Sequence, residues 1–237
     1  MACGCCGFDA TADLQFNAKR ARLDLARYRA KGPDSTTRLL LNSLAELGET
    51  QGSSLLDVGS GVGALTFELL ELGVTHATDV EAAAAFLAVA AEEALRRKRS
   101  GVTEFVQGDF LSVAAQLPAA TMVTLDRVIC CYPAFQPMLT EALQHAQRCL
   151  GISYPRERWY VRLGIAVENV MRRLTGNPFR AFVHPVSRME EIIERAGFCL
   201  AKRRQTWMWC ADVYLRKSGP ASSGAAPALA RSPTESE

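Results

Sequence analysis

Short apolar runs alternate with longer amphipathic segments through the middle of the chain. Five short runs are rich in Leu, Val, Ile and Thr and are typical of strands: 54–58, 75–80, 103–108, 121–129 and 151–155. Between them, helical periodicity covers residues 64–73, 82–99 and 135–150. This alternation predicts βαβ units, and therefore an α/β fold whose parallel sheet is covered by helices on both faces. Short strands that are apolar throughout suit a sheet buried on both sides.

The pattern changes after Pro155. Residues 157–174 and 187–197 are predicted to be helices, and a loop with two prolines joins them. The last two apolar runs, 198–206 and 208–217, lie too close together for a crossover helix. They are therefore predicted to pair as an antiparallel hairpin.

Two more helices are predicted before the first strand, one over residues 11–31 and a second that ends at Gly48. We expect residues 1–50 to form a helical lid, of which residues 1–10 are flexible. Residues 51–217 are expected to form one domain. Residues 218–237 are rich in Gly, Pro, Ser and Ala, a composition typical of a disordered tail.

Composition excludes several classes of protein. The 237-residue chain is 49% hydrophobic and 22% charged, and its formal net charge of +2 does not favour a nucleic-acid partner. No apolar run approaches the roughly 18 residues that span a bilayer, and the N-terminus lacks the features of a secretory signal. We therefore expect a cytoplasmic protein with no membrane partner, whose eight cysteines are thiols. The cluster of Cys3, Cys5 and Cys6 could bind a soft metal or metalloid through its thiolates. It lacks the paired spacing of a zinc site, so incidental thiols are favoured and no metal is expected.

The most specific motif is LLDVGSGVGA, from Leu55 to Ala64, in which glycine occupies every second position of a strand-to-helix turn. Glycine lacks the Cβ that would keep a ligand away from the backbone. The loop fits both a dinucleotide site and a site for S-adenosylmethionine. Asp57 separates the two, because a carboxylate is repelled by a pyrophosphate but attracted by the positive amino and sulfonium groups of S-adenosylmethionine.

Two further acids lie at the ends of the next two predicted strands. Asp79 closes the second strand, where a carboxylate can accept both hydroxyls of a ribose. Asp109 follows the third strand, where a side chain can reach the exocyclic amine of adenine. Because the carboxyl ends of parallel strands share one edge, Asp57, Asp79 and Asp109 are expected to line one concave pocket.

These motifs, in this order, resemble those of the class I S-adenosylmethionine-dependent methyltransferases. LLDVGSGVG resembles the family's acid-and-glycine signature, ATDVE its ribose acid and QGDF its adenine acid. The resemblance implies a Rossmann-like, mostly parallel seven-stranded sheet of order 3-2-1-4-5-7-6, with the last strand antiparallel, and S-adenosyl-L-methionine as cofactor. The residues expected to bind the cofactor are Asp57, Gly59, Ser60, Gly61, Gly63, Asp79, Val80, Gly108, Asp109, Phe110 and Asp126.

The end of the fourth strand, LDRVICCYP, should lie beside the transferable methyl group if the family geometry holds. Amino-group and glutamine methyltransferases of this fold carry Asn or Asp, two prolines and an aromatic residue there. Cys130, Cys131, Tyr132 and Pro133 depart from that pattern, which weakens an amide-type interpretation. Tyr132 is a candidate to orient the acceptor. Cys130 and Cys131 are candidates either to line its pocket or to act only as small packing residues.

Residues 154–184 resemble in pattern the corresponding segment of the magnesium-protoporphyrin O-methyltransferases, which also follows the fifth strand. That subgroup esterifies a propionate, and Arg156 and Arg180 are candidates to hold such a carboxylate. His184 is the candidate general base, because its pKa class suits proton transfer near neutral pH. The alternative is a loop histidine hydrogen-bonded to the backbone.

Together these features predict an S-adenosylmethionine-dependent methyltransferase that acts at oxygen on a small or medium-sized molecule. An RNA methyltransferase is the enzymatic alternative, and it would need a continuous basic groove with aromatic stacking residues. A nucleoside-binding or partner-binding module that keeps the fold without turnover is the other alternative. No feature of the sequence indicates an oligomeric state.

Overall fold

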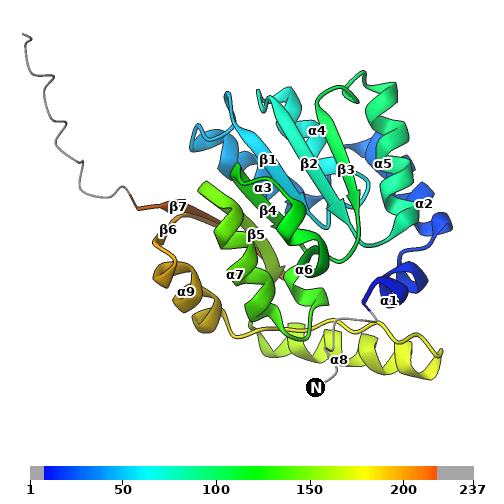
Figure 1. Cartoon of the computed structure of the whole chain (residues 1–237). Helices are drawn as coiled ribbons and strands as arrows, with labels where there is room; N and C mark the ends of the chain where they lie inside the picture. Colours follow the sequence, from blue (N-terminus) through cyan, green and yellow to red (C-terminus); the bar gives the residue numbers. More distant parts are fainter. Residues whose placement is uncertain (1–7, 218–237) are drawn as a thin grey trace, which may run out of the picture.

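A seven-stranded sheet of order β3-β2-β1-β4-β5-β7-β6 forms the centre of the molecule (Figure 1). The computed structural model describes residues 8–217; the expectations for the N-terminal cysteine cluster and for the C-terminal tail lie outside the described residues. The strands are β1 Ser54–Val58, β2 His76–Glu81, β3 Thr103–Gln107, β4 Ala120–Asp126, β5 Ala146–Pro155, β6 Phe198–Gln205 and β7 Trp209–Arg216. Strand β7 is antiparallel to both β5 and β6, whereas the pairs among β1 to β5 are parallel. The predicted topology is thereby confirmed.

Helices cover both faces of this sheet. They are α1 Phe8–Gln15, α2 Ala18–Lys31, α3 Ser35–Glu46, α4 Ala64–Glu71, α5 Ala84–Arg96, α6 Phe110–Val113, α7 Phe135–His145, α8 Trp159–Leu174 and α9 Val186–Arg195, with short 3-10 turns η1 Ala114–Gln116 and η2 Ile129–Cys131. No helix within residues 8–217 is long and apolar enough to cross a membrane.

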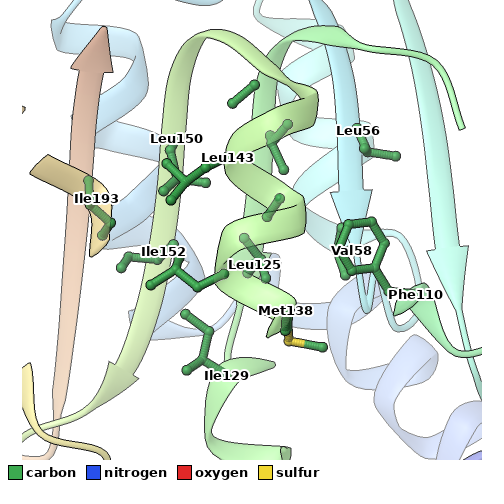
Figure 2. Close-up of a cluster of buried hydrophobic side chains, with 14 of the residues drawn as sticks. Leu56, Val58, Phe110, Leu125, Ile129, Met138, Leu143, Leu150, Ile152 and Ile193 are labelled. Carbon is green, nitrogen blue, oxygen red and sulfur yellow. The ribbon is translucent and has the colours of Figure 1, made fainter. Parts of the chain in front are cut away.

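The core has one layer on each face of the sheet. On one face α6, α7 and α9 pack on the strands, and Figure 2 shows Met138 and Leu143 of α7 in one layer with Leu125, Leu150 and Ile152 of the strands. On the other face α2 to α5 enclose the second layer. Burying a large apolar side chain is worth about 1.5–3 kcal/mol, so these two layers hold the strands in register.

Several predicted boundaries are wrong, and strand β4 ends at Asp126, three residues before the predicted end at residue 129. The helix predicted over residues 11–31 is two helices, because the side chain of Asn17 accepts a hydrogen bond from the Arg20 amide and starts α2 anew. The helix predicted through Leu150 ends at His145, and the residues after it begin β5, where Cys149 pairs with both Met122 and Leu215. Strand β2 ends at Glu81, one residue after its predicted end at Val80, so Asp79 lies two residues before the end of the strand.

Candidate functional site

A cavity of about 270 Å³ opens at the carboxyl ends of β1, β2 and β4. The chain leaves β1 toward β2 and β3 and then returns to β4 on the other side, so the cavity lies where the strand order reverses. This switch point is where open α/β sheets bind ligands. The glycine loop after β1, helix α2 and the segment after β4 form its walls.

The three glycines of the loop have different roles. Their φ angles are +67°, +61° and +75° at Gly59, Gly61 and Gly63, in the left-handed region that favours glycine. A Cβ on Gly59 would lie 2.4 Å from Cγ2 of Val128, so the loop and the segment after β4 can approach only because that atom is absent. Gly59 and Gly61 line the cavity, whereas Gly63 does not. A Cβ on Gly63 would lie 2.6 Å from the ring of Phe67, so this glycine allows α4 to start instead of contacting a ligand.

Asp57 and Asp79 sit opposite each other on β1 and β2 and share one hydroxyl. The Oγ1 of Thr66 donates to Asp57 at 3.1 Å and to Asp79 at 2.6 Å, and Thr124 donates to Asp57 at 2.6 Å. Burial raises the pKa of Asp57 to about 7 and, together with the charge of Asp57, raises the pKa of Asp79 well above its usual value.

Only Asp57 of this pair lines the cavity. Asp79 is completely buried under α4, so the prediction that it faces the pocket is wrong. The predicted strand ended at Val80 with Asp79 as its closing acid, whereas β2 reaches Glu81.

Glu81, the last residue of β2, lines the cavity at the strand end where Asp79 was expected. Its carboxylate accepts hydrogen bonds from the amides of Gly61 and Ala83, both at 2.9 Å, and lines the cavity. Burial raises its pKa. A count of the strand to its true end would have identified this acid, which sits in the same ATDVE motif.

Several residues predicted to bind the cofactor line the cavity, but Asp109, which follows the third strand, does not. Val80, Gly108 and Phe110 line the cavity together with Ser60 of the glycine loop, as predicted. Asp109 does not line it: its carboxylate accepts a hydrogen bond from the amide of Leu111, at the start of α6. The expectation that three successive strand-end acids share one pocket therefore holds for Asp57 alone among the three.

Asp126, at the end of β4, does line the cavity. Thr37 donates to it at 2.5 Å, and the hydroxyl of Ser153 donates to its other oxygen. The next residue, Arg127, has a left-handed φ of +63°, and its amide donates to Ser153. This conformation is uncommon for a residue with a side chain and often marks a functional site. The Arg127 guanidinium lines the cavity and pairs with Asp34 at 2.7 Å.

Of the residues predicted after Arg127, the structure brings Cys131 and Tyr132 to the cavity but neither Cys130 nor His184. Cys130 is buried, with its sulfur 4.0 Å from that of Cys131. The Nε2 of His184 lies 2.9 Å from the carbonyl oxygen of Tyr132 and 3.1 Å from that of Ile129. Its ring packs against Phe135, and burial lowers its pKa. His184 therefore holds the backbone behind the cavity wall, which corrects its assignment as a base facing the acceptor.

Neither predicted carboxylate-binding arginine reaches the cavity. Arg156 donates from Nη1 to the carbonyl oxygen of Thr206 at 3.0 Å, and Arg180 donates to the carbonyl oxygens of Asn177 and Phe179 at 2.6 and 2.8 Å. Both guanidiniums therefore satisfy loop backbone, and the prediction that they line an acceptor pocket is wrong.

Helix α2 supplies the cavity residues that the motifs did not indicate. Arg20, Asp24, Arg27 and Tyr28 line the cavity from this helix, and Phe16 lines it from the turn before it. Arg20 pairs with Asp24 at 2.8 Å. The basic pattern of residues 18–31 was visible in the sequence, but the pattern alone does not show which side of a helix faces a ligand.

Comparison with known proteins identifies the type of domain that carries the cavity. Residues 56–151 match the family model described as a methyltransferase domain, and the matched stretch contains the glycine loop, Glu81 and Asp126. The chain therefore contains a methyltransferase domain. Its strand order is the one that the resemblance to the class I S-adenosylmethionine-dependent methyltransferases implied.

Curated relatives of this methyltransferase match over short stretches. Ribosomal protein L11 methyltransferases from Xanthomonas axonopodis pv. citri (strain 306) and Xanthomonas oryzae pv. oryzae (strain MAFF 311018) are 46% and 43% identical over 63 and 68 residues. Those stretches cover 25% and 27% of this chain and 21% and 22% of those proteins. The chain thus spans about a fifth of the length of the curated relatives it matches.

Solved structures agree over most of the chain. A magnesium protoporphyrin IX methyltransferase from Synechocystis PCC 6803, with bound SAM, has a TM-score of 0.65 and 17% identity and covers 91% of this chain and 100% of that one. An O-methyltransferase family protein from Burkholderia thailandensis has a TM-score of 0.68 and 15% identity over 88% of this chain and 64% of that one. At such low identity these likenesses show the fold.

The residues around the cavity fit S-adenosylmethionine, the donor that this family uses. Its sulfonium and amino groups are positive, and the carboxylates of Asp57, Glu81 and Asp126 line the cavity. Its ribose needs acceptors, which a carboxylate supplies. A side chain on Gly59 or Gly61 would narrow the approach to the backbone at the same place.

Proposed function

We propose that this methyltransferase transfers the methyl group of S-adenosylmethionine to an oxygen atom of a small or medium-sized acceptor, and that the acceptor oxygen belongs to a carboxylate. The observation that carries the proposal is the chemistry of the cavity wall. Three arginines, Arg20, Arg27 and Arg127, line the cavity, whereas no histidine within residues 8–217 does. Arginine binds carboxylates through two parallel hydrogen bonds.

In the donor half, we assign Glu81 to the ribose hydroxyls and Asp57 to the positive methionine end. Glu81 keeps free lone pairs after accepting from Gly61 and Ala83, because each carboxylate oxygen can accept two hydrogen bonds. Asp57 carries its charge only above its raised pKa of about 7, and a nearby cation lowers that pKa. Phe110 and Val80 supply apolar surface for the base.

In the acceptor half, we assign Arg127 to the reacting carboxylate and Tyr132 to its orientation. Arg127 is half-exposed and follows Asp126 directly, so one guanidinium can exchange Asp34 for a carboxylate ligand without backbone movement. Cys131 remains a thiol, because its hydrogen bond with Cys130 and its burial raise its pKa well above the ordinary value. It therefore lines the pocket without competing as a nucleophile.

When bound, S-adenosylmethionine supplies an electrophilic methyl carbon, whose bond to sulfur breaks with its electron pair as the acceptor oxygen forms the new bond. A carboxylate brings no proton to this step, so the chain needs no general base. The protein residues then align the oxygen and exclude water, which can lower a barrier by roughly 7–11 kcal/mol.

The test begins with calorimetric titration of S-adenosylmethionine into the purified chain and into Glu81→Gln. Methyl transfer from tritium-labelled donor is then measured with three acceptor panels: aliphatic and aromatic carboxylic acids, phenols and single-stranded RNA. A methyl ester releases volatile methanol in alkali, whereas a methyl ether or a methylated base retains its label. We expect label that alkali releases, from the carboxylic acid panel.

Each other outcome contradicts a different part of the proposal. Stable label on a phenol would show that the acceptor is a hydroxyl, and label on RNA would favour the RNA methyltransferase. Donor binding without transfer to any panel would favour the non-catalytic module. Absence of donor binding would contradict the assignment of the cavity itself.

A further inference from the structure

Helix α8 carries an apolar surface that the rest of the described chain leaves exposed. We define the α8 stripe as Trp159, Leu163, Val167, Val170, Met171 and Leu174. Each of these side chains is at least 55% exposed, and Trp159 and Leu174 reach 76%. Their spacings of three, four and seven residues place them along one face of the helix. Such a continuous apolar surface on a folded protein marks an interaction site.

The opposite face of α8 attaches the helix to the protein. Val161 is the one buried residue of the helix, and the side-chain amide of Asn169 exchanges two hydrogen bonds with the backbone of Ala181, at 2.8 and 3.0 Å. The guanidinium of Arg172 lies over the ring of Phe179, 5.1 Å from its centre. With this face fixed, the α8 stripe points away from the domain, and Figure 1 shows α8 at the outer boundary of the molecule, below the sheet.

An aromatic cluster extends the stripe at the first turn of the helix. The ring of Tyr160 stacks on Trp207 with ring centres 5.9 Å apart, and the Tyr160 hydroxyl donates to the Trp207 carbonyl oxygen at 2.8 Å. Trp159 meets the same tyrosine edge-on at 5.8 Å. Trp207, in the turn between β6 and β7, is 69% exposed. Tryptophan and tyrosine prefer the boundary between lipid headgroups and acyl chains.

The charges beside the stripe indicate its partner. Arg162 and Arg173 lie on one margin of the stripe, and Arg158 is the N-cap residue directly before Trp159. Neither Arg158 nor Arg173 has an ion pair among residues 8–217, whereas Arg162 pairs with Glu157. The acid within the helix, Glu168, lies beside the opposite margin of the stripe, where its charge is paired with Arg172. The complement of this surface is therefore apolar in its centre and anionic along the arginine margin.

We propose that the α8 stripe binds flat to an anionic lipid bilayer, with its apolar side chains at the acyl boundary and Arg158 and Arg173 at the lipid headgroups. This is the geometry of an interfacial helix, which lies on a membrane and does not cross it. A second copy of the chain suits the charges less well. In an antiparallel two-fold pairing of α8 with itself, the arginine margin of one copy would lie beside that of the other.

The test measures co-sedimentation of the full chain with extruded vesicles, made of phosphatidylcholine alone or mixed with phosphatidylglycerol. We expect binding to the anionic vesicles that weakens as salt increases. The double variant Leu163→Asp/Val170→Asp should bind about tenfold more weakly or worse. Its matched control is Leu95→Asp, because Leu95 is 69% exposed on α5, away from the stripe. Both changes lie on exposed surface, and unchanged thermal melting checks the fold.

A second variant pair tests the charge. Arg173→Glu should weaken binding to anionic vesicles about fivefold, whereas Arg22→Glu, an exposed arginine of α2, should not. Wild-type protein that fails to sediment with either vesicle would overturn the proposal, as would a double variant that binds as well as the wild type. Sedimentation velocity showing a dimer that Leu163→Asp/Val170→Asp dissociates would identify the stripe as a subunit interface and would also overturn it.

Discussion

Glu81 and Asp79 are two carboxylates on one strand with opposite environments. Asp79 is enclosed beneath α4, and Glu81 borders the cavity and bonds to the glycine loop. We expect Glu81→Gln to weaken binding of S-adenosylmethionine roughly tenfold to a hundredfold, because a hydrogen bond to a charged group is worth about 1.5–3 kcal/mol. Isothermal titration measures the change.

Asp79→Asn is the control for this pair of carboxylates. It changes a buried carboxyl group, whose pKa lies well above its usual value, without touching the cavity. The dissociation constant for S-adenosylmethionine should therefore stay within about threefold of the wild-type value. A larger loss of affinity in Asp79→Asn than in Glu81→Gln would show that Asp79 faces the ribose, as the sequence motif had suggested.

Gly59 is a second residue at which a substitution should have a measurable effect, in this case on the free energy of unfolding. In Gly59→Ala the new methyl group would lie 2.4 Å from Val128, in addition to the strain of a φ of +67°. We expect this variant to lose about 1–3 kcal/mol of unfolding free energy beyond the strain alone. Gly48→Ala supplies the strain without the clash, because its φ is +71° and nothing lies within 4 Å of the added Cβ.

Urea unfolding of the two glycine variants separates these contributions. The double variant Gly59→Ala/Val128→Ala should recover part of the loss, because it removes the atoms that clash. Equal midpoints for Gly59→Ala and Gly48→Ala would mean that Val128 moves aside freely, and that the close approach is not fixed by packing.

At the scale of elements, strands β1 and β2 place two acids opposite each other, so folding is coupled to a proton. Burial raises the pKa of Asp57 from 3.8 to about 7, so the folded protein binds a proton that the unfolded chain releases above pH 3.8. Stability contributed by this group is present at low pH and is lost as pH rises toward 7. Binding of the positive donor favours the ionised form, so affinity for S-adenosylmethionine should rise across the same range.

Asp57→Asn tests this coupling between fold and ligand. In this variant, the part of the decrease in unfolding free energy between about pH 4 and pH 7 that comes from Asp57 should be absent. The affinity of the variant for S-adenosylmethionine should be lower than that of the wild type and should not change with pH. Calorimetry at several pH values gives both quantities. A wild-type affinity that is independent of pH from 6 to 8, within roughly a unit of the pKa of Asp57, would contradict the assigned coupling.

Helices and strands could be predicted where a single periodicity dominated the segment. Their end residues could not be predicted as well. The strand and helix order of the sheet follows from alternating apolar runs, and the final hairpin from the short distance between its runs. The end of α7 was missed because residues 146–150 fit either periodicity, and their pairing with β4 and β7 decides for a strand. The same limit affected β2, whose predicted end fell one residue short of Glu81, so Asp79 was taken as the acid at the cavity.

At the scale of the whole molecule, the donor half of the cavity was largely readable and the acceptor half was not. The glycine loop, Asp57 and Asp126 belong to local motifs at strand ends. Arg127 and the residues of α2 meet only through tertiary packing, which no local pattern encodes. Arg156, Arg180 and His184 have the right chemistry, but loop backbone satisfies all three.

Helix α2 closes one side of the cavity, so its attachment to the sheet controls the site. Arg29 of α2 pairs at 2.8 Å with Glu93 of α5, whose carboxylate is buried and also bonds to Arg96 and Arg97. The pKa of Glu93 is lowered to about 2, chiefly by the hydrogen bond from Arg96. Burial opposes this shift, and the hydrogen bonds from Arg97 and Arg29 add to it. Stability from this cluster is therefore present above pH 4.5 and is lost as pH falls toward 2.

Arg29→Gln should loosen α2 while leaving every cavity side chain in place. We expect faster amide hydrogen exchange over residues 18–31 and an affinity for S-adenosylmethionine about twofold to fivefold weaker, since a partly exposed ion pair is worth up to about 1 kcal/mol. Arg99→Gln is the matched control, because Arg99 pairs with Glu71 at 3.0 Å and does not touch α2. If affinity fell without faster exchange in α2, the cavity would depend on the charge of Arg29 and not on the position of the helix.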